Sequence, residues 1–185
     1  MKTTDSMVLF WGSSEIYSNF HYSPFVVNGV RYRCVEQFMM ACKAMLFGDM
    51  VALGLIMKET VPFKMQQIGR TVKGYTDEKW FAVRDDVVFQ GCLAKFQQNQ
   101  GMGRTLLATD DLMMVEASPK DRIWGIGLGE NDPRALIPTQ WLGDNRLGKA
   151  LMRVRDVLRG IFAAPAPSFP LPAPPAAPAQ AALAL

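Results

Sequence analysis

The longest helical pattern in the chain, at about residues 78 to 98, constrains the fold more than any other feature. Its apolar side chains form two rows at helical spacing, Trp80, Val83 and Val87 in one and Phe81, Val88, Cys92 and Phe96 in the other. Two such rows predict a helix that is buried on more than half of its circumference. Gly91 interrupts them at a cost of about 1 kcal/mol relative to alanine. We therefore expect another part of the molecule to approach that face closely.

Shorter helical patterns flank this long helix on both sides. Apolar spacing predicts a helix from about residue 35 to Gly48, where glycine is a typical stop. A cap at Asp49 and a proline at position 62 predict two more helices, ending near residues 58 and 70. A short helix is expected at about residues 101 to 109, and a last one begins at Leu147.

The strand signals are few and short. Residues 7–11 and the apolar run at residues 112–115 read as strands, and Asn28-Gly29 between β-branched runs predicts a hairpin. We therefore expect a helix-rich α+β fold. It would be one compact domain of about seven helices with a small antiparallel β component, made of the N-terminal strand, the hairpin and the central strand.

The composition changes after residue 162. Residues 163–185 hold seven of the twelve prolines, many alanines and no charge, which predicts a disordered, extended tail. We divide the chain into a domain at residues 1–162 and a tail at residues 163–185. Truncation after Ala163 is expected to leave the fold unchanged.

Composition also limits the classes of function. The net charge of +3 is too small to argue for nucleic-acid binding. Cys34, Cys42 and Cys92 are odd in number and lack CxxC spacing, and His21 is the one histidine, so neither a disulfide framework nor a metal site is expected. The chain shows no signal peptide and no membrane-spanning apolar run. We expect a cytoplasmic protein without a cofactor or a membrane partner; its oligomeric state stays open.

Residues 116–129 combine side chains that suit a ligand pocket. Asp121 and Trp124 follow the turn at Ser118-Pro119, and glycines stand at positions 125, 127 and 129. An acid, an indole ring and a glycine-rich backbone can hold a flat polar ligand. The alternative is a hairpin corner in which Asp121 caps a turn and Trp124 fills the core.

Several motifs together resemble one family. They are Ile16-Tyr-Ser-Asn-Phe with Ser23-Pro-Phe, Val35-Glu-Gln-Phe with Lys43-Ala44, Gly69-Arg70, Ala94-Lys-Phe-Gln-Gln-Asn99, Glu116-Ala-Ser-Pro with Asp121 and Trp124-Gly-Ile-Gly-Leu, and Trp141-Leu-Gly-Asp-Asn-Arg-Leu-Gly with Met152-Arg-Val-Arg. Over about residues 8 to 162 the chain is similar to the NADAR family, the YbiA-like N-glycosidases. The resemblance does not include His21 or the tail.

This resemblance implies hydrolysis of an N-glycosidic bond between a (phospho)ribose and a base or amine. One implied substrate class is the phosphoribosylamino-pyrimidines and related early intermediates of riboflavin biosynthesis. The alternative is ADP-ribose attached to guanine in nucleic acid or nucleotides, so nucleic acid could be a partner as ADP-ribosylated substrate. A non-catalytic module that holds ADP-ribose or NAD and a scaffold protein that recruits partners through its tail are the competing classes.

Three residues are the catalytic candidates. Glu36 or Asp121 can protonate the leaving nitrogen or stabilise the oxocarbenium-like transition state. Lys95 can attack the sugar carbon as an amine if burial keeps it neutral. Each also has an ordinary structural interpretation: a charge at a helix N-terminus for Glu36, a turn cap for Asp121 and a solvated lysine for Lys95.

Further residues are candidates for substrate binding. Trp124 and Phe20 would form opposite walls, Asn19 would supply amide hydrogen bonds, and Arg84 would bind a phosphate. Weaker candidates are Asn99, Gly125 and Asp132. Arg84 could instead form a surface ion pair, and Asn99 and Asp132 could make ordinary caps or turns.

Overall fold

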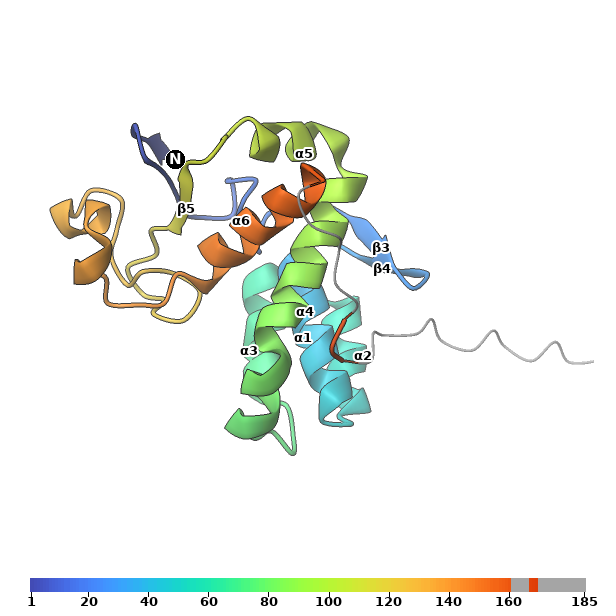
Figure 1. Ribbon diagram of the computed structural model, residues 1–185. Helices are drawn as coiled ribbons and strands as arrows, with labels where there is room; N and C mark the ends of the chain where they lie inside the picture. Colours follow the sequence, from blue (N-terminus) through green and yellow to red (C-terminus); the bar gives the residue numbers. More distant parts are fainter. Residues whose placement is uncertain (161–166, 170–185) are drawn as a thin grey trace, which may run out of the picture.

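The computed structural model describes residues 1–160 and 167–169, and these residues form the expected helix-rich α+β architecture (Figure 1). The helices are α1 (Val35–Leu46), α2 (Met50–Lys58), α3 (Pro62–Arg70), α4 (Asp77–Gln98), α5 (Gln100–Leu107) and α6 (Arg146–Leu158), with the 3-10 helices η1 (Pro133–Leu136) and η2 (Pro138–Gln140). The strands are β1 (Lys2–Thr3), β2 (Met7–Phe10), β3 (Phe25–Val27), β4 (Val30–Tyr32) and β5 (Met113–Glu116).

Helix α4 lies at the centre of the fold. It packs against α1 on one side and α6 on another, and α1 also contacts α2 and α3. In Figure 1, α1 to α4 stand together, while the three-stranded sheet and the loops that follow it lie beyond α6. A Cβ atom at Gly91 would lie 2.8 Å from the Phe38 ring and 3.2 Å from Val35. The close approach expected from Gly91 is therefore the contact between α4 and α1.

The hairpin forms where Asn28-Gly29 predicts it, and both turn residues have positive φ, 49° and 77°. The outer edge of β3 is occupied by a side chain from α4. Gln98 Nε2 donates to the Val26 carbonyl at 2.8 Å, and Gln98 Oε1 accepts from the Val26 N–H at 2.9 Å. The amide of Gln98 thus forms the two hydrogen bonds that a neighbouring strand would otherwise supply.

The prediction that the strands pair antiparallel is wrong for one pair, β2 and β5. β1 pairs antiparallel with β2, but β2 and β5 are parallel, with Met7 opposite Met113 and Phe10 opposite Glu116. Parallel strands require a long crossover connection. Here the connection contains α1 to α5, so the strand direction depends on how the whole helical region folds.

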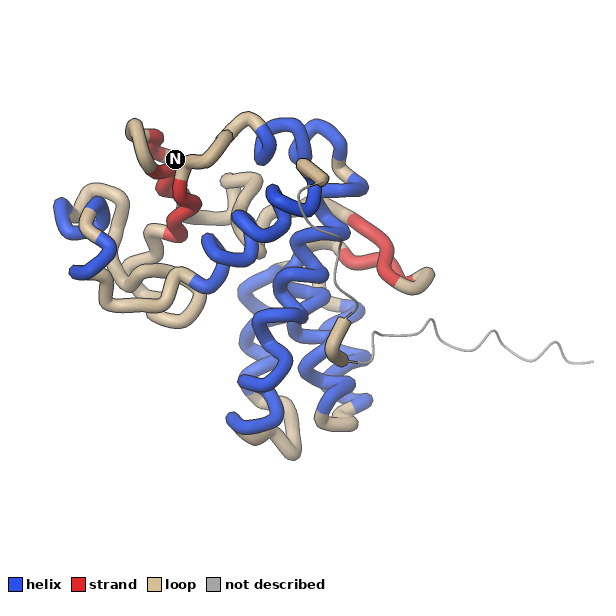
Figure 2. Tube along the Cα trace, viewed as in Figure 1, coloured by secondary structure: helices blue, strands red, loops and turns tan. Residues whose placement is uncertain are grey.

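The free edge of β5 is held by Asn145. This residue is buried, and its backbone has the left-handed conformation, with φ of 51°. Its Oδ1 accepts from the Glu116 N–H at 3.0 Å, and its Nδ2 donates to the Met114 carbonyl at 2.8 Å. Asn145 immediately precedes α6, so these bonds also fix the start of that helix. Figure 2 shows that the chain between β5 and α6 is mostly loop.

The cysteines are buried and unpaired, as expected from their number and spacing. Burial raises the pKa of the Cys34 thiol to about 11 and that of Cys92 to about 12. No group of three or more histidine, cysteine or acidic side chains within residues 1–160 and 167–169 could hold a metal ion. None of the helices in this part of the chain is long and apolar enough to cross a membrane.

Most of the predicted tail lies outside the described residues, but three of its members are described, and two of these, Ser168 and Phe169, contact the domain. Ser168 Oγ donates to the Asp86 carboxylate at 2.5 Å, and Phe169 is buried in the main hydrophobic core. This contact differs from the expectation of a tail that does not pack, because an aromatic residue supplies the apolar area that alanine and proline lack.

We predict that Phe169→Ala lowers the melting temperature by several degrees. Truncation of a buried phenylalanine to alanine costs about 3 to 5 kcal/mol, and each kcal/mol shifts Tm by about 2 to 4 °C in a domain of this size. Thermal unfolding measures the change, with the exposed neighbour Pro167→Ala as the control. An unchanged Tm in both Phe169→Ala and the protein truncated after Ala163 would contradict the contact.

Candidate functional site

A cavity of about 460 Å³ lies between α1, α3, the first half of α4 and the loop that carries Asp121 and Trp124. It is lined by Glu36, Met39, Met40, Lys43, Gln66, Arg70, Tyr75, Trp80, Phe81, Arg84, Lys120, Asp121, Arg122, Ile123 and Trp124. Four residues predicted from the sequence therefore meet here: Glu36, Arg84, Asp121 and Trp124.

Glu36 stands in the first turn of α1 and is only 1% exposed. Its N–H donates to the Asn19 carbonyl, which fixes the start of the helix, but its Oε1 has no hydrogen-bond partner. Burial, followed by the charges of Glu116 and Asp121, raises the pKa of this carboxyl to about 8. The raised pKa favours the protonated form of the Glu36 carboxyl, and the residue lines the cavity.

Glu116 is a second carboxyl residue near the site, half-buried, that was not predicted from the sequence as a site residue. It ends β5, and its Oε2 is enclosed without a hydrogen-bond partner. Burial and then the charge of Asp121 raise its pKa to about 8. Its charge is also the largest electrostatic influence on Glu36. Its position at the carboxyl end of the central strand, beside the loop with Asp121, was the available signal.

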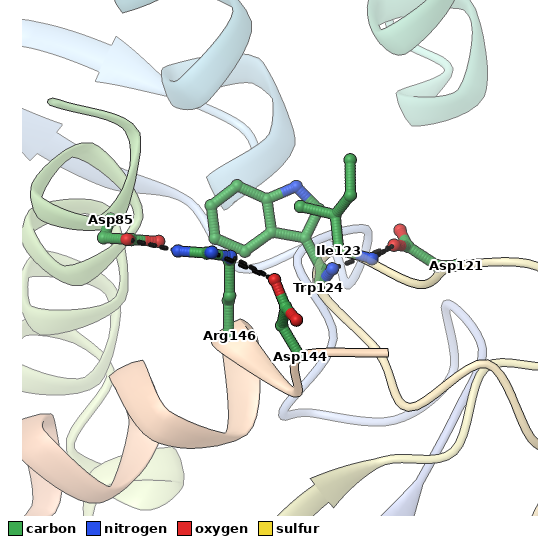
Figure 3. Close-up of polar contacts among 6 residues, drawn as sticks. All are labelled: Asp85, Asp121, Ile123, Trp124, Asp144 and Arg146. Carbon is green, nitrogen blue, oxygen red and sulfur yellow. Dashed lines mark hydrogen bonds and ion pairs between the residues drawn. The ribbon is translucent and has the colours of Figure 1, made fainter. Parts of the chain in front are cut away.

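Asp121 fits both of its sequence interpretations. Its Oδ1 accepts hydrogen bonds from the N–H groups of Ile123 and Trp124, each at 2.8 Å, as a turn cap does. It also lines the cavity, as does the half-buried indole of Trp124. In Figure 3 the Asp121 carboxylate faces the backbone of the two residues that it holds. The cap therefore sets the position of the aromatic wall.

The loop that carries Trp124 is anchored to α4 through Arg146. The guanidinium contacts the Asp85 carboxylate of α4 at 2.6 Å and the Asp144 carboxylate at 2.9 Å. Figure 3 shows this arginine between the two acids and beside the Trp124 indole. Since Leu147 N–H donates to the Trp124 carbonyl at 3.1 Å, the first turn of α6 and the cavity wall are held together.

Arg84 is the best-placed cation in the cavity. It is 8% exposed, its guanidinium lies 4.0 Å from the Phe81 ring centroid, and its Nε is enclosed without a partner. Among the ion pairs of residues 1–160 and 167–169, none involves Arg84, so the alternative of a surface ion pair does not apply. A buried arginine with a free donor suits an anionic ligand.

Further cations around the cavity were not predicted as site residues. The Lys43 amine lies 4.2 Å from the Tyr75 ring centroid, and Arg70, Lys120 and Arg122 complete the set. Burial, and then the charge of Arg70, lowers the pKa of Lys43 against the opposing effect of Glu36. Lys43 follows Glu36 by seven residues on the same helix face, which was a usable signal.

Lys95 does not line this cavity. It is fully buried on α4, and its amine donates to the Ser18 carbonyl at 2.9 Å. Burial lowers its pKa to about 8, against the opposing effects of Cys92 and Cys34. The solvated interpretation is therefore wrong, and the expected lowering of its pKa is confirmed. Its catalytic role stays a proposal.

The remaining candidates also lie outside the cavity lining. Asn19 is buried beside α1, and half-buried Phe20 lies on the same loop. Asn99 donates from its side chain to two carbonyls, those of Pro24 and Lys95. These three residues support the N-terminal loop and the ends of α4 and α1.

Gly125 and Asp132 have local structural roles. A Cβ atom at Gly125 would lie 2.9 Å from the Glu116 carbonyl, so the glycine permits close packing of the loop on β5. Asp132 caps η1 by accepting from the Arg134 N–H at 3.0 Å, and it forms an ion pair with the same residue at 2.7 Å. The ordinary cap considered from the sequence is what Asp132 forms.

The fold and the cavity define a helix-rich α+β domain with a buried, unpartnered carboxyl in a cation-rich site. A NADAR domain model matches residues 9–159, so the chain belongs to the NADAR domain family, as the motifs predicted.

Three relatives support this assignment. Protein irg-1 of Caenorhabditis elegans is 37% identical, covering 84% of this chain and 81% of that protein. N-glycosidase R617 of Acanthamoeba polyphaga mimivirus is also 37% identical, covering 83% of this chain and 96% of the other. The NMR structure of the Escherichia coli protein YbiA aligns with a TM-score of 0.70 at 27% identity, covering 86% and 89% of the two chains. YbiA of E. coli K12 is itself named an N-glycosidase. These names agree with the predicted enzyme class, hydrolases acting on N-glycosyl compounds.

We predict that the protein loses stability as the pH rises from about 4.5 to about 8, and that Glu36→Gln flattens this dependence. The pKa of Glu36 is raised on folding from 4.5 to about 8, so its contribution is fully present below 4.5 and is lost as the pH passes 8. Glu116 acts with the same sign, so some slope remains.

Melting temperatures measured across this pH range provide the test. Glu78→Gln alters an exposed glutamate on α4 outside the cavity and serves as the matched control. If the melting temperature of Glu36→Gln changes with pH as steeply as that of the control, Glu36 is not a buried group that titrates in this range.

Proposed function

We propose that the protein is an N-glycosidase that hydrolyses the bond between a (phospho)ribose and a base or amine. The proposal rests on the Glu36 carboxyl, which is buried, lacks a partner on Oε1 and lines a cavity with several cations. A binding module would have no use for a buried acid without a partner, because such a group costs stability. The names of the relatives R617 and YbiA support the same activity.

Each group has a defined task in the proposed reaction. As the C–N bond breaks, Glu36 donates its proton to the departing nitrogen, which would otherwise leave as an anion. The Asp121 carboxylate stabilises the positive charge that develops on the sugar. Trp124 stacks on the ligand, and the Arg84 guanidinium binds a phosphate in the cavity.

The cavity favours an anionic N-glycoside. We propose a phosphoribosylamino-pyrimidine of early riboflavin biosynthesis as the substrate, with its phosphate near Arg84. The alternative substrate is ADP-ribose on guanine, either free or in nucleic acid. The observation that supports this alternative is the number of cations in the cavity. Lys43 and Arg70 could bind one phosphate of a diphosphate, and Arg84 could bind the other.

We predict that Glu36→Gln lowers kcat by about 10²- to 10⁴-fold, the usual contribution of a positioned general acid. Glutamine keeps the shape of the side chain but supplies no acidic proton, so substrate affinity should change little. Mass-spectrometric detection of released sugar from both substrate classes measures activity and ranks them. Glu78→Gln should retain wild-type turnover. A fully active Glu36→Gln enzyme would overturn the role of Glu36 as general acid, and release of sugar from neither substrate class by the unmodified protein would overturn the proposed activity.

Lys95 enters the proposal as a nucleophile. Its pKa of about 8 leaves part of the amine population neutral at physiological pH. In this step Nζ bonds to the anomeric carbon as the base leaves with a proton. Nζ then loses a proton and the sugar ring opens to an imine, which water hydrolyses. Because Lys95 does not line the cavity, its amine must both leave the Ser18 carbonyl and move into the cavity to reach the substrate.

We predict that borohydride, added during turnover, traps a reduced sugar adduct on Lys95. Lys95→Arg should abolish the adduct, because a guanidinium stays protonated and is a poor nucleophile. Peptide mapping by mass spectrometry locates the modification. Absence of an adduct together with an inactive but still binding Lys95→Arg enzyme would leave the chemistry to Glu36, Asp121 and water. Absence of an adduct with full activity would remove Lys95 from the reaction.

A further inference from the structure

A second cavity, of about 350 Å³, shares no lining residue with the first. It is lined by Tyr22, Arg31, Arg33, Gln37 and Met57. The floor of this cavity is held in place because the buried Gln37 side-chain amide forms hydrogen bonds through both its oxygen and its nitrogen. Gln37 Oε1 accepts from the Arg33 N–H at 2.8 Å, and Nε2 donates to the Ile56 carbonyl at 3.0 Å.

Two arginines face this cavity without partners. Arg31 and Arg33 are exposed on either side of buried Tyr32, so the alternation of the strand turns both to the same side of the hairpin. Two residues along a strand span about 6.6 Å. Neither guanidinium forms an ion pair or a side-chain hydrogen bond with any described residue.

In the described part of the chain, no carboxylate from the adjoining turn forms an ion pair with either arginine. The Glu59 carbonyl lies 3.4 Å from Gln37 Nε2, so Glu59 is near the floor of the cavity. However, its carboxylate accepts from the N–H groups of Thr60 and Val61 at 2.7 and 2.8 Å. Glu59 is therefore engaged at the turn before α3.

Tyr22 supplies an aromatic surface beside the arginines. It is 62% exposed, although tyrosine usually buries much of its ring, and it forms no ring contact within the described part of the chain. An exposed aromatic ring next to two neighbouring guanidiniums can bind a base by stacking and the phosphate of the same nucleotide by charge.

We propose that this second cavity binds a phosphate carried next to an aromatic base, with Arg31 and Arg33 on the phosphate and Tyr22 stacked on the base. A free nucleotide and a single-stranded nucleic acid both present this chemistry. The site is separate from the Glu36 cavity, and the proposal does not depend on the glycosidase reaction.

The test measures binding of fluorescein-labelled oligothymidylate by anisotropy and of AMP by calorimetry. Arg31→Gln/Arg33→Gln should weaken binding of at least one probe by about tenfold or more. The matched control, Lys2→Gln/Arg104→Gln, removes the same charge from exposed positions outside both cavities. If the oligonucleotide is the ligand, the slope of log K against log[salt] should fall in magnitude by about 0.7 in the arginine variant, since both arginines contact one phosphate and each phosphate contact of a single strand contributes about 0.7.

The stacking contact has its own readout. Tyr22→Ala should weaken binding of the base-containing probes, whereas Tyr22→Phe should keep it, because both aromatic rings can stack. Tight oligonucleotide binding with weak AMP binding identifies nucleic acid as the source, and comparable binding identifies the nucleotide. Melting temperatures verify that each variant is folded. Equal affinities of the folded arginine variant and the control for both probes would overturn the proposal, as would the absence of binding by the unmodified protein.

Discussion

The position of the site depends on one buried amide, the side chain of Asn145. Its two hydrogen bonds to β5 hold the strand end that carries Glu116, and its backbone N–H donates to the Gly125 carbonyl of the cavity loop. The left-handed φ of this residue then directs the chain into α6. Because asparagine tolerates this conformation better than most residues, one residue links the central strand, the cavity loop and the last helix through its side chain and its backbone. Arg146 completes the link to α4.

The electrostatics of the cavity oppose stability in a way that suits a reaction. Two carboxyls, Glu36 and Glu116, are enclosed with unpaired oxygens, and each charge disfavours the other. Arg84 likewise has an unpaired, enclosed donor. Such groups are expensive to bury in a fold that serves only as a scaffold. A ligand that brings both a leaving nitrogen and an anion would satisfy them together, so the same groups that destabilise the empty domain would favour the bound state.

The sequence predicted local features well and long-range ones poorly. The Asn28-Gly29 turn and the proline at the start of α3 act through their own backbone preferences, so the hairpin and that helix are found where expected. The direction of β5 depends on a crossover of five helices, which no local pattern encodes. The same limit applies to the site. Glu36, Asp121 and Trp124 were identified as site residues within motifs. Arg70 and Glu116 stand in motifs too, but no local pattern indicated that Arg70 lines the cavity from α3 or that the charge of Glu116 acts on Glu36. Lys95 is buried because other elements pack around α4, and the apolar periodicity of the helix alone did not predict which of its polar residues would be covered.

The amide of Gln98 has a consequence for how the molecule behaves at high concentration. A short sheet leaves unpaired N–H and C=O groups along its edge, and these can recruit a strand from another molecule and start aggregation. On β3, Gln98 already occupies both groups of Val26. An intermolecular strand would have to displace a side chain that α4 holds in position. The hairpin is thereby protected against pairing between molecules without the charged or proline-rich edge that many proteins use.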